Sequence, residues 1–236
     1  MWPPKLELCT DSPEGVKLAL EGGADRVELC AALDSGGLSP SPSLLRSCLR
    51  MGDLPIHCML RPRPGGFIYS KEEVEWMQDE MLQFKKDGAA GVVFGCLDAA
   101  HDVDAANTQI LTKHAHSLGL EVTFHRAFDH LKDSHKGLDQ LIEIGVDRIL
   151  TSGGERTAEE GLGIIRSLVD HSRGRIQIMA GSGVSKENAR RIASVGVDAL
   201  HLTSHKKYEE DGLLEGMGHC YMPDPEKWFA VKKLFS

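Results

Sequence analysis

The stretch GGADRVEL at residues 22–29 carries the pattern on which the fold prediction depends. Glycine favours the end of a helix because it adopts positive φ freely, and the small and acidic residues after it lead into a buried strand. The same kind of phrase returns three times along the chain, as DGAAGVVF, IGVDRILT and VGVDALHL at 87–94, 144–151 and 195–202. Four versions of one helix-to-strand connection predict repeated βα units.

Eight short apolar runs alternate with longer amphipathic stretches along the chain. The predicted strands are 5–9, 25–30, 55–61, 91–96, 120–126, 147–151, 175–181 and 198–203. The helices between them are expected to begin near Ser12, Ser41, Lys71, Asp104, Ser134, Thr157, Ser185 and Asp224, several of which suit a helix N-cap. Eight such units predict an α/β fold closed into a single (β/α)8 barrel of the TIM type. A doubly wound open sheet would read similarly.

We expect one domain over the whole chain, residues 1–236, because barrels of this type commonly use this length. No linker or low-complexity tract interrupts the pattern. Residues 205–226 lack a clear period and are predicted to form a loop before the terminal helix.

Composition excludes several classes of partner. The formal net charge of −8 does not suit a surface that neutralises phosphate backbones, so no nucleic acid partner is expected. No apolar run approaches the roughly 20 residues that a membrane helix needs, so no membrane partner is expected either. The six cysteines are scattered without a CxxC pair, and no secretory leader is apparent. The expected location is therefore cytoplasmic, with reduced thiols.

The two faces of the predicted strands differ in character, because side chains alternate along a strand. One face is apolar and suits the surrounding helices. The residues predicted to point into the barrel are Glu7, Cys9, Glu28, Cys30, His57, Met59, Arg61, Thr123, His125, Ile149, Thr151, Met179, Gly181, His201 and Thr203. Buried charges are tolerated only when they satisfy one another or serve a site. We interpret them as a polar pocket, in which Arg61, His125 or His201 would balance Glu7 and Glu28. A buried ion-pair network that holds the barrel in register is the alternative.

Cys9 and Cys30 end the first two predicted strands in the same alternation phase. Adjacent strands lie about 4.8 Å apart, so the two sulfurs could reach one ion, and thiolates are the ligands that a soft ion such as Cu(I) prefers. Cysteine is also a common small core residue. Because Cys48, Cys58 and Cys96 fall at helical or helix-facing positions, we assign them to core packing.

Two glycine-rich loops follow the sixth and seventh predicted strands, TSGGER at 151–156 and AGSGVS at 180–185. Backbone N–H groups of such loops bind phosphate or carboxylate in many barrels, although glycine also simply permits tight turns. The residues considered for anion binding are Ser152, Gly153, Gly181, Ser182 and Gly183.

Several segments resemble the CutC copper-homeostasis family: ELC (7–9), GGADRVELCAALDSGGLSPS (22–41), MLRPRPGGFIYS (59–70), VTFHRAFD (122–129), ILTSGG (149–154) and GRIQIMAGSGV (174–184). The resemblance implies a TIM-like barrel, a cytosolic location and a homo-oligomer, either a dimer or a tetramer. It also implies Cu(I) binding through cysteines of the first two strands, which Cys9 and Cys30 match. The part of the chain after Ser204 looks unlike the usual ending of the family.

The leading hypothesis is a protein that handles Cu(I) through Cys9 and Cys30, with the neighbouring charged side chains setting the local potential. The rival is a barrel enzyme of lyase, aldolase or isomerase type that acts on a small anionic or phosphorylated metabolite. Its candidate catalytic residues are Glu7, Glu28, Arg61, His125 and Asp129, with His125 or Glu28 as general acid or base and Arg61 fixing the anion. A scaffold role is a third alternative, and no organic cofactor is predicted.

Overall fold

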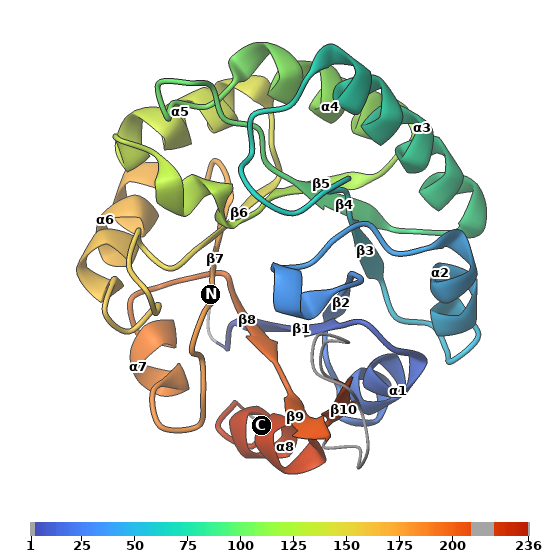
Figure 1. Cartoon of the computed structure of the whole chain (residues 1–236). Helices are drawn as coiled ribbons and strands as arrows, with labels where there is room; N and C mark the ends of the chain where they lie inside the picture. The colour runs from blue at the N-terminus through green and yellow to red at the C-terminus, as the bar shows by residue number, and fades with distance from the viewer. Residues whose placement is uncertain (1–2, 209–219, 236) are drawn as a thin grey trace.

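The computed structural model describes residues 3–208 and 220–235. Its centre is a closed barrel of parallel strands in the order β1 to β8, which confirms the predicted (β/α)8 barrel over the open sheet (Figure 1). The strands are β1 (Lys5–Thr10), β2 (Arg26–Leu29), β3 (Ile56–Met59), β4 (Gly91–Phe94), β5 (Glu121–Phe124), β6 (Arg148–Thr151), β7 (Gln177–Ala180) and β8 (Ala199–Thr203). Each corresponds to one of the predicted runs.

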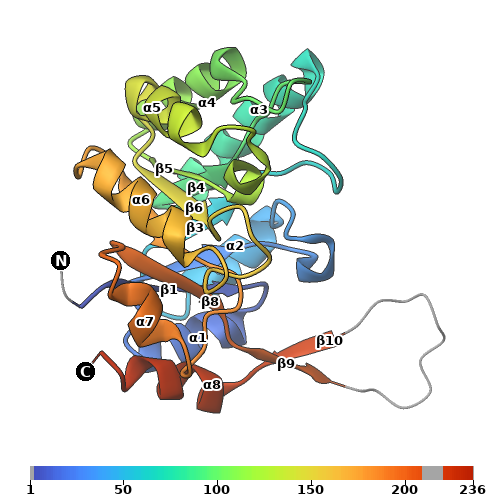
Figure 2. The same cartoon turned by 90° about the vertical axis from the view of Figure 1, so that its left-hand side faces the viewer.

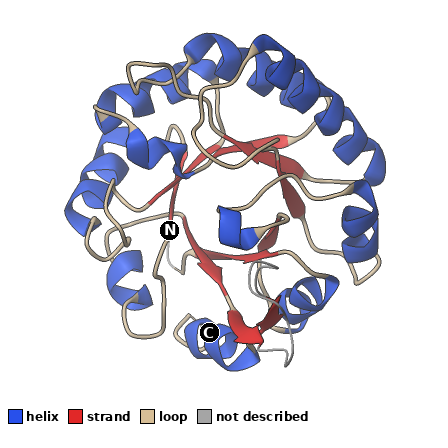
Figure 3. Ribbon diagram, in the orientation of Figure 1, coloured by secondary structure: helices blue, strands red, loops and turns tan. Residues whose placement is uncertain are grey.

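Helices surround the barrel on its outside, as the view along the barrel shows (Figure 3). They are α1 (Pro13–Glu21), α2 (Pro42–Leu49), α3 (Lys71–Asp87), α4 (Ala105–Ser117), α5 (Ser134–Ile144), α6 (Leu162–Ser172), α7 (Ala189–Ala193) and α8 (Pro225–Lys232). Two short 3-10 helices, η1 (Leu33–Ser35) and η2 (Arg126–His130), follow β2 and β5. Within the described residues, no helix has the length and apolar character to cross a membrane.

Two helices begin later than the sequence pattern predicts. Helix α6 begins at Leu162 rather than near Thr157, because the preceding residues tie the β6 and β7 loops together. The backbone N–H of Ala158 donates to Ser182 O at 3.0 Å, and the Ser182 hydroxyl donates to Arg156 O at 2.8 Å. Helix α7 begins only at Ala189.

The segment predicted as a loop at 205–226 contains two strands. β9 (His205–Tyr208) and β10 (Cys220–Pro223) pair antiparallel and project from the barrel (Figure 2). The pairing supplies the backbone hydrogen bonds that a loop would leave to water. The rest of the predicted loop between them, residues 209–219, lies outside the described residues.

The apolar core lies between the barrel and the helices, as predicted from alternation. Leu6 and Val27, for example, are buried in this layer. The prediction for β6 was wrong by one residue. Ile149 packs toward the helices, because it is paired in register with the outward Ile178, while Leu150 pairs with Met179 and packs with it inside. Thr203, predicted to point inward, is exposed.

Candidate functional site

The two predicted cysteines meet at the carboxyl end of the barrel. Cys9 lies near the end of β1 and Cys30 directly follows β2, and their Sγ atoms are 3.8 Å apart. Both are buried free thiols, and they pack with Met59 and Val93. Cys9 is paired in register with Glu28, and Cys30 comes two residues after Glu28. The two cysteines therefore meet diagonally across the strands rather than directly opposite each other.

Glu28 is the carboxylate beside this thiol pair. The Cys9 thiol donates to Glu28 Oε1 at 3.3 Å. The hydrogen bond between Cys9 and Cys30, burial, and the charge of Glu28 together raise the pKa of the Cys9 thiol well above its usual value. Burial also raises the pKa of Glu28. Cys9 is therefore a protonated thiol at neutral pH.

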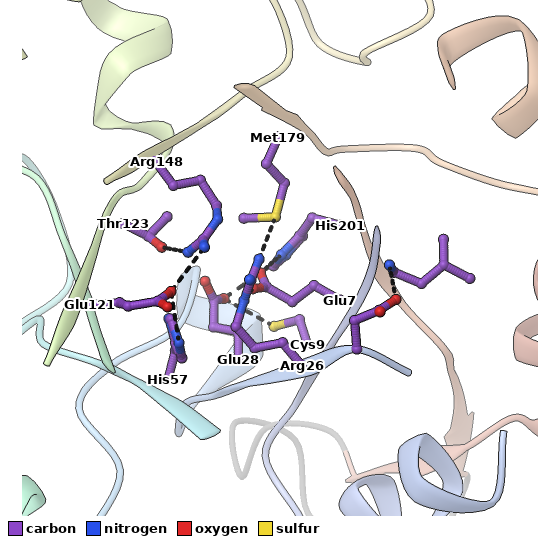
Figure 4. A network of polar contacts seen from close by, with 12 residues as sticks. Glu7, Cys9, Arg26, Glu28, His57, Glu121, Thr123, Arg148, Met179 and His201 are labelled. Atoms are coloured by element: carbon purple, nitrogen blue, oxygen red, sulfur yellow. Dashed lines mark hydrogen bonds and ion pairs between the residues drawn. The ribbon is translucent and has the colours of Figure 1, made fainter. Parts of the chain in front are cut away.

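Glu7 precedes Cys9 by two residues on β1, and its contacts with Arg26 and His201 link β1 to both of its neighbours (Figure 4). His201 Nδ1 is 2.7 Å from Glu7 Oε1, and its Nε2 is 3.9 Å from Glu28 Oε1. Arg26 forms a buried ion pair with the other oxygen of Glu7. Burial opposes the ionisation of Glu7, but Arg26 and the hydrogen bond with His201 prevail and hold its pKa far below the usual range.

Arg26 and Arg148 are interior charges that the sequence prediction missed. Arg148 Nη2 lies 3.0 Å from Glu121 Oε2, and Arg148 Nη1 donates to Thr123 at 2.9 Å. A signal was available for Arg26, which is in phase with the inward-pointing Glu28. Arg148 was out of phase with Ile149, which was predicted to point inward. These contacts form an ion-pair network of the kind that the sequence left as the alternative to a pocket, buried at Glu7 and the two arginines but exposed at Glu121.

A cavity of about 330 Å³ opens above the network. The residues that line it come from the ends of six strands and the loops after them: Cys9, Glu28, Leu33, Gly36, Met59, Arg61, Phe67, His125, Arg126, Ala127, His130, Leu150 and His201. Four of the predicted site residues, Cys9, Glu28, Arg61 and His125, thus border one space. Glu7 lies in the network below it and Cys30 beside Cys9.

His125 is held as a neutral imidazole at the wall of this cavity. Its Nδ1 accepts a hydrogen bond from the backbone N–H of Ala127 at 3.1 Å, so the ring proton lies on Nε2. Burial, followed by the nearby charge of Arg61, lowers the pKa of His125 to about 3. The ring stacks at a tilt against Phe67, with centroids 4.9 Å apart.

Comparison with known proteins assigns the chain to a family. The sequence profile described as CutC family matches residues 4–206. The chain belongs to the CutC family. A CutC family protein from Vibrio vulnificus (strain CMCP6) is 46% identical over 200 residues, which cover 84% of this chain and 80% of that protein. One from Histophilus somni (strain 2336) is 39% identical over an alignment of 242 positions that covers 98% of each chain.

A solved CutC structure has the same architecture. The crystal structure of CutC from Streptococcus agalactiae, a protein named for copper homeostasis, superposes with a TM-score of 0.78 at 30% identity. The alignment covers 84% of this chain and 97% of that chain. The CutC family profile ends at residue 206, so β10 and α8 lie beyond it.

In this CutC chain, the loops that were predicted to bind an anion form hydrogen bonds with other parts of the protein. Asp129 accepts hydrogen bonds from the backbone N–H of Ser152 at 2.9 Å and of Gly154 at 3.2 Å, and from the Thr151 hydroxyl at 2.5 Å. Its own carboxylate thus takes the place of an external anion in the β6 loop. Neither Asp129 nor the set Ser152, Gly153, Gly181, Ser182 and Gly183 is among the residues that line the cavity.

Proposed function

We propose that this chain binds Cu(I) between the sulfurs of Cys9 and Cys30 and acts in copper homeostasis. The observation that carries the proposal is the 3.8 Å distance between the two sulfurs. Metal–thiolate bonds of about 2.3 Å, the length found in zinc sites, span up to about 4.6 Å between two sulfurs. The pair therefore fits a single ion, and two soft ligands favour Cu(I) over harder ions. The name of the Streptococcus agalactiae relative supports the same assignment.

The surroundings of the pair suit reversible binding. The Cys9 thiol is protonated in the free protein, so an incoming ion must displace a proton, and Glu28 Oε1 already accepts the hydrogen bond of that thiol. The cavity borders Cys9, which gives an ion a route to the pair from solvent. We infer a cytoplasmic site of action, because both sulfurs must stay reduced.

A second donor set overlaps the first. Ligand atoms of Cys9, Glu28 and His201 lie within 4.8 Å of one another. One sulfur, one oxygen and one nitrogen favour a borderline ion such as Zn²⁺ rather than Cu(I). Cys30 distinguishes the two sets, because it belongs to the thiol pair alone.

The test is an anaerobic titration of the reduced protein with Cu(I) against a competing chelator. The variants are Cys9→Ser and Cys30→Ser, and Cys58→Ser is the matched control, because Cys58 is equally buried but faces the helices. We expect one tight site that both pair variants lose and the control keeps. Binding that survives Cys30→Ser would rule out the thiol pair as the site.

The oligomer implied by the family resemblance remains a proposal. We expect a dimer or a tetramer, and light scattering during size-exclusion chromatography would measure the mass directly. A monomer at micromolar concentration would contradict it.

A further inference from the structure

Three residues that carry sulfur stand at the carboxyl ends of three successive strands. Cys9 lies near the end of β1, Cys30 directly follows β2, and Met59 is the last residue of β3. They are only 6%, 0% and 5% exposed, and they belong with Val93 to one interior cluster. Of the residues that the structure describes, Met59 brings the one sulfur in this cluster besides the two thiols. Its thioether is therefore a candidate third donor.

The register of the strands places Met59 next to Cys30. Leu29 on β2 is paired with Cys58 on β3. Cys30 and Met59 each come one residue later, so they stand side by side at the ends of strands about 4.8 Å apart, with both side chains toward the interior. A Cβ added at Gly37 would lie 3.4 Å from Met59 Cε and 3.5 Å from Cys30 Sγ. The thioether methyl group and the thiol thus border the same point.

The spacing of the two thiols leaves a position open on a bound ion. Two metal–sulfur bonds of about 2.3 Å to sulfurs 3.8 Å apart meet at an angle of about 110°. An ion with two thiolates alone would place them on opposite sides, with the sulfurs about 4.6 Å apart. The narrower angle suits an ion with three or four ligands. The pair therefore calls for at least one further donor.

The chemistry of the neighbouring side chains indicates which donor this is. Glu28 and His201 form a donor group with Cys9, but Cys30 does not belong to that group. Cu(I) prefers thiolate and thioether sulfur, whereas carboxylate oxygen suits harder ions. Met59 also borders the cavity, as Cys9 does, so it lies where an ion from solvent would reach the pair. A thioether has no proton to lose, and the flexible methionine side chain adapts to the position of an ion.

We propose that the Met59 thioether is the third ligand of the Cu(I) ion bound by Cys9 and Cys30. This inference rests on the proposed function and makes the site one of three sulfurs. Three soft ligands favour Cu(I) over Zn²⁺, which takes cysteine, histidine and carboxylate ligands in proteins. Met59 thus contributes to the selectivity of the site as well as to its affinity.

The first experiment is anaerobic Cu(I) titration of Met59→Leu against a competing chelator, in buffer without added thiol. Leucine has nearly the volume of methionine, so the barrel should fold. Met77→Leu is the matched control, because Met77 is equally buried but lies on α3 in the layer between helices and barrel. We expect Cu(I) affinity to fall at least about tenfold in Met59→Leu and to stay within about twofold in the control. Equal affinities of the two variants would overturn the proposal.

X-ray absorption at the copper edge counts the ligands directly. With one equivalent of Cu(I), we expect three sulfur neighbours at about 2.3 Å in the unmodified protein and in Met77→Leu, and two in Met59→Leu. Only two sulfur neighbours in the unmodified protein, or three in Met59→Leu, would contradict the thioether ligand. The count on the unmodified protein does not depend on whether a variant folds, and circular dichroism checks the fold of each variant.

The thiol variants separate this inference from the proposed function. If Cys9→Ser and Cys30→Ser lose Cu(I) binding but Met59→Leu binds as tightly as the unmodified protein, the thiol pair is correct and the thioether ligand is wrong. If Cys30→Ser keeps full affinity, or the unmodified protein binds no Cu(I), both proposals fail.

Discussion

His125 is neutral because the fold removes it from water, and this has a consequence for stability. Its pKa is lowered to about 3 in the folded protein, against the ordinary 6.5 expected in the unfolded chain. The unfolded chain therefore binds the proton more readily, so this contribution is present above about pH 6.5 and is lost as the pH falls toward about 3. From pH 7 to pH 5 the loss amounts to about 2 kcal/mol for this one residue.

Urea unfolding at the two pH values checks this effect with His125→Asn as the reference. We expect the unmodified protein to lose about 2 kcal/mol more than the variant on acidification. Because other titrating groups, such as His57, are common to both proteins, their contributions cancel in the difference. Equal losses would show that His125 is not held neutral.

Asp129 has a side chain that is only 5% exposed and is well bonded. Its carboxylate joins η2 to the β6 loop through Thr151, Ser152 and Gly154. We expect Asp129→Asn to lower the free energy of unfolding by about 3 kcal/mol, because an amide nitrogen would then face donors. The control is Asp133→Asn, since Asp133 is the N-cap of α5 and asparagine caps as well as aspartate. Similar stabilities of the two variants in urea would contradict the structural role.

At the scale of elements, the sequence predicted every strand of the barrel and, for most strands, which residues point into the barrel. Alternation succeeded on β1 and β2 because charged and apolar residues there fall on opposite faces. It failed on β6, where both faces carry apolar residues and Arg148 gave the only inward signal. The cavity was unpredictable in another way. Its shape depends on where Arg61 is held by the backbone carbonyl oxygens of Ser35 and Gly37, which lie far from it in the sequence.

Gly95, directly after β4, sets the position of His125. A Cβ at Gly95 would lie 2.6 Å from His125 Nδ1 and 2.8 Å from the Ala127 Cβ. We expect Gly95→Ala to destabilise the protein by about 1–3 kcal/mol, because the imidazole must move. Gly163→Ala in α6 is the control, since nothing lies within 4 Å of that position. Thermal unfolding measures the effect, and equal stabilities of the two variants would contradict the steric argument.

At the scale of the whole molecule, the barrel is completed by a segment that the family profile does not include. Helix α8 follows β8 through the β9–β10 hairpin and lies against the end of α1. Because β8 pairs with β1, this helix covers the junction where the barrel closes. Trp228 is fully buried there, and its Nε1–H donates to Gly22 O at 3.1 Å. The chain beyond residue 206 thus contributes to the same core as the strands that carry the cysteines.

Because α8 covers the junction, we expect the loss of stability at Trp228 to depend on how much of the side chain is removed. We expect Trp228→Ala to lower the free energy of unfolding by about 3–5 kcal/mol, since it leaves a large cavity at the junction. Trp228→Phe keeps most of the apolar contact and loses the hydrogen bond, so about 1 kcal/mol is expected. Urea unfolding followed by both far-UV circular dichroism and the reactivity of the buried thiols would measure the change. Because the closed barrel should unfold as one unit, both probes should shift together. If the thiols kept their protection while α8 alone melted, the junction would not control the site.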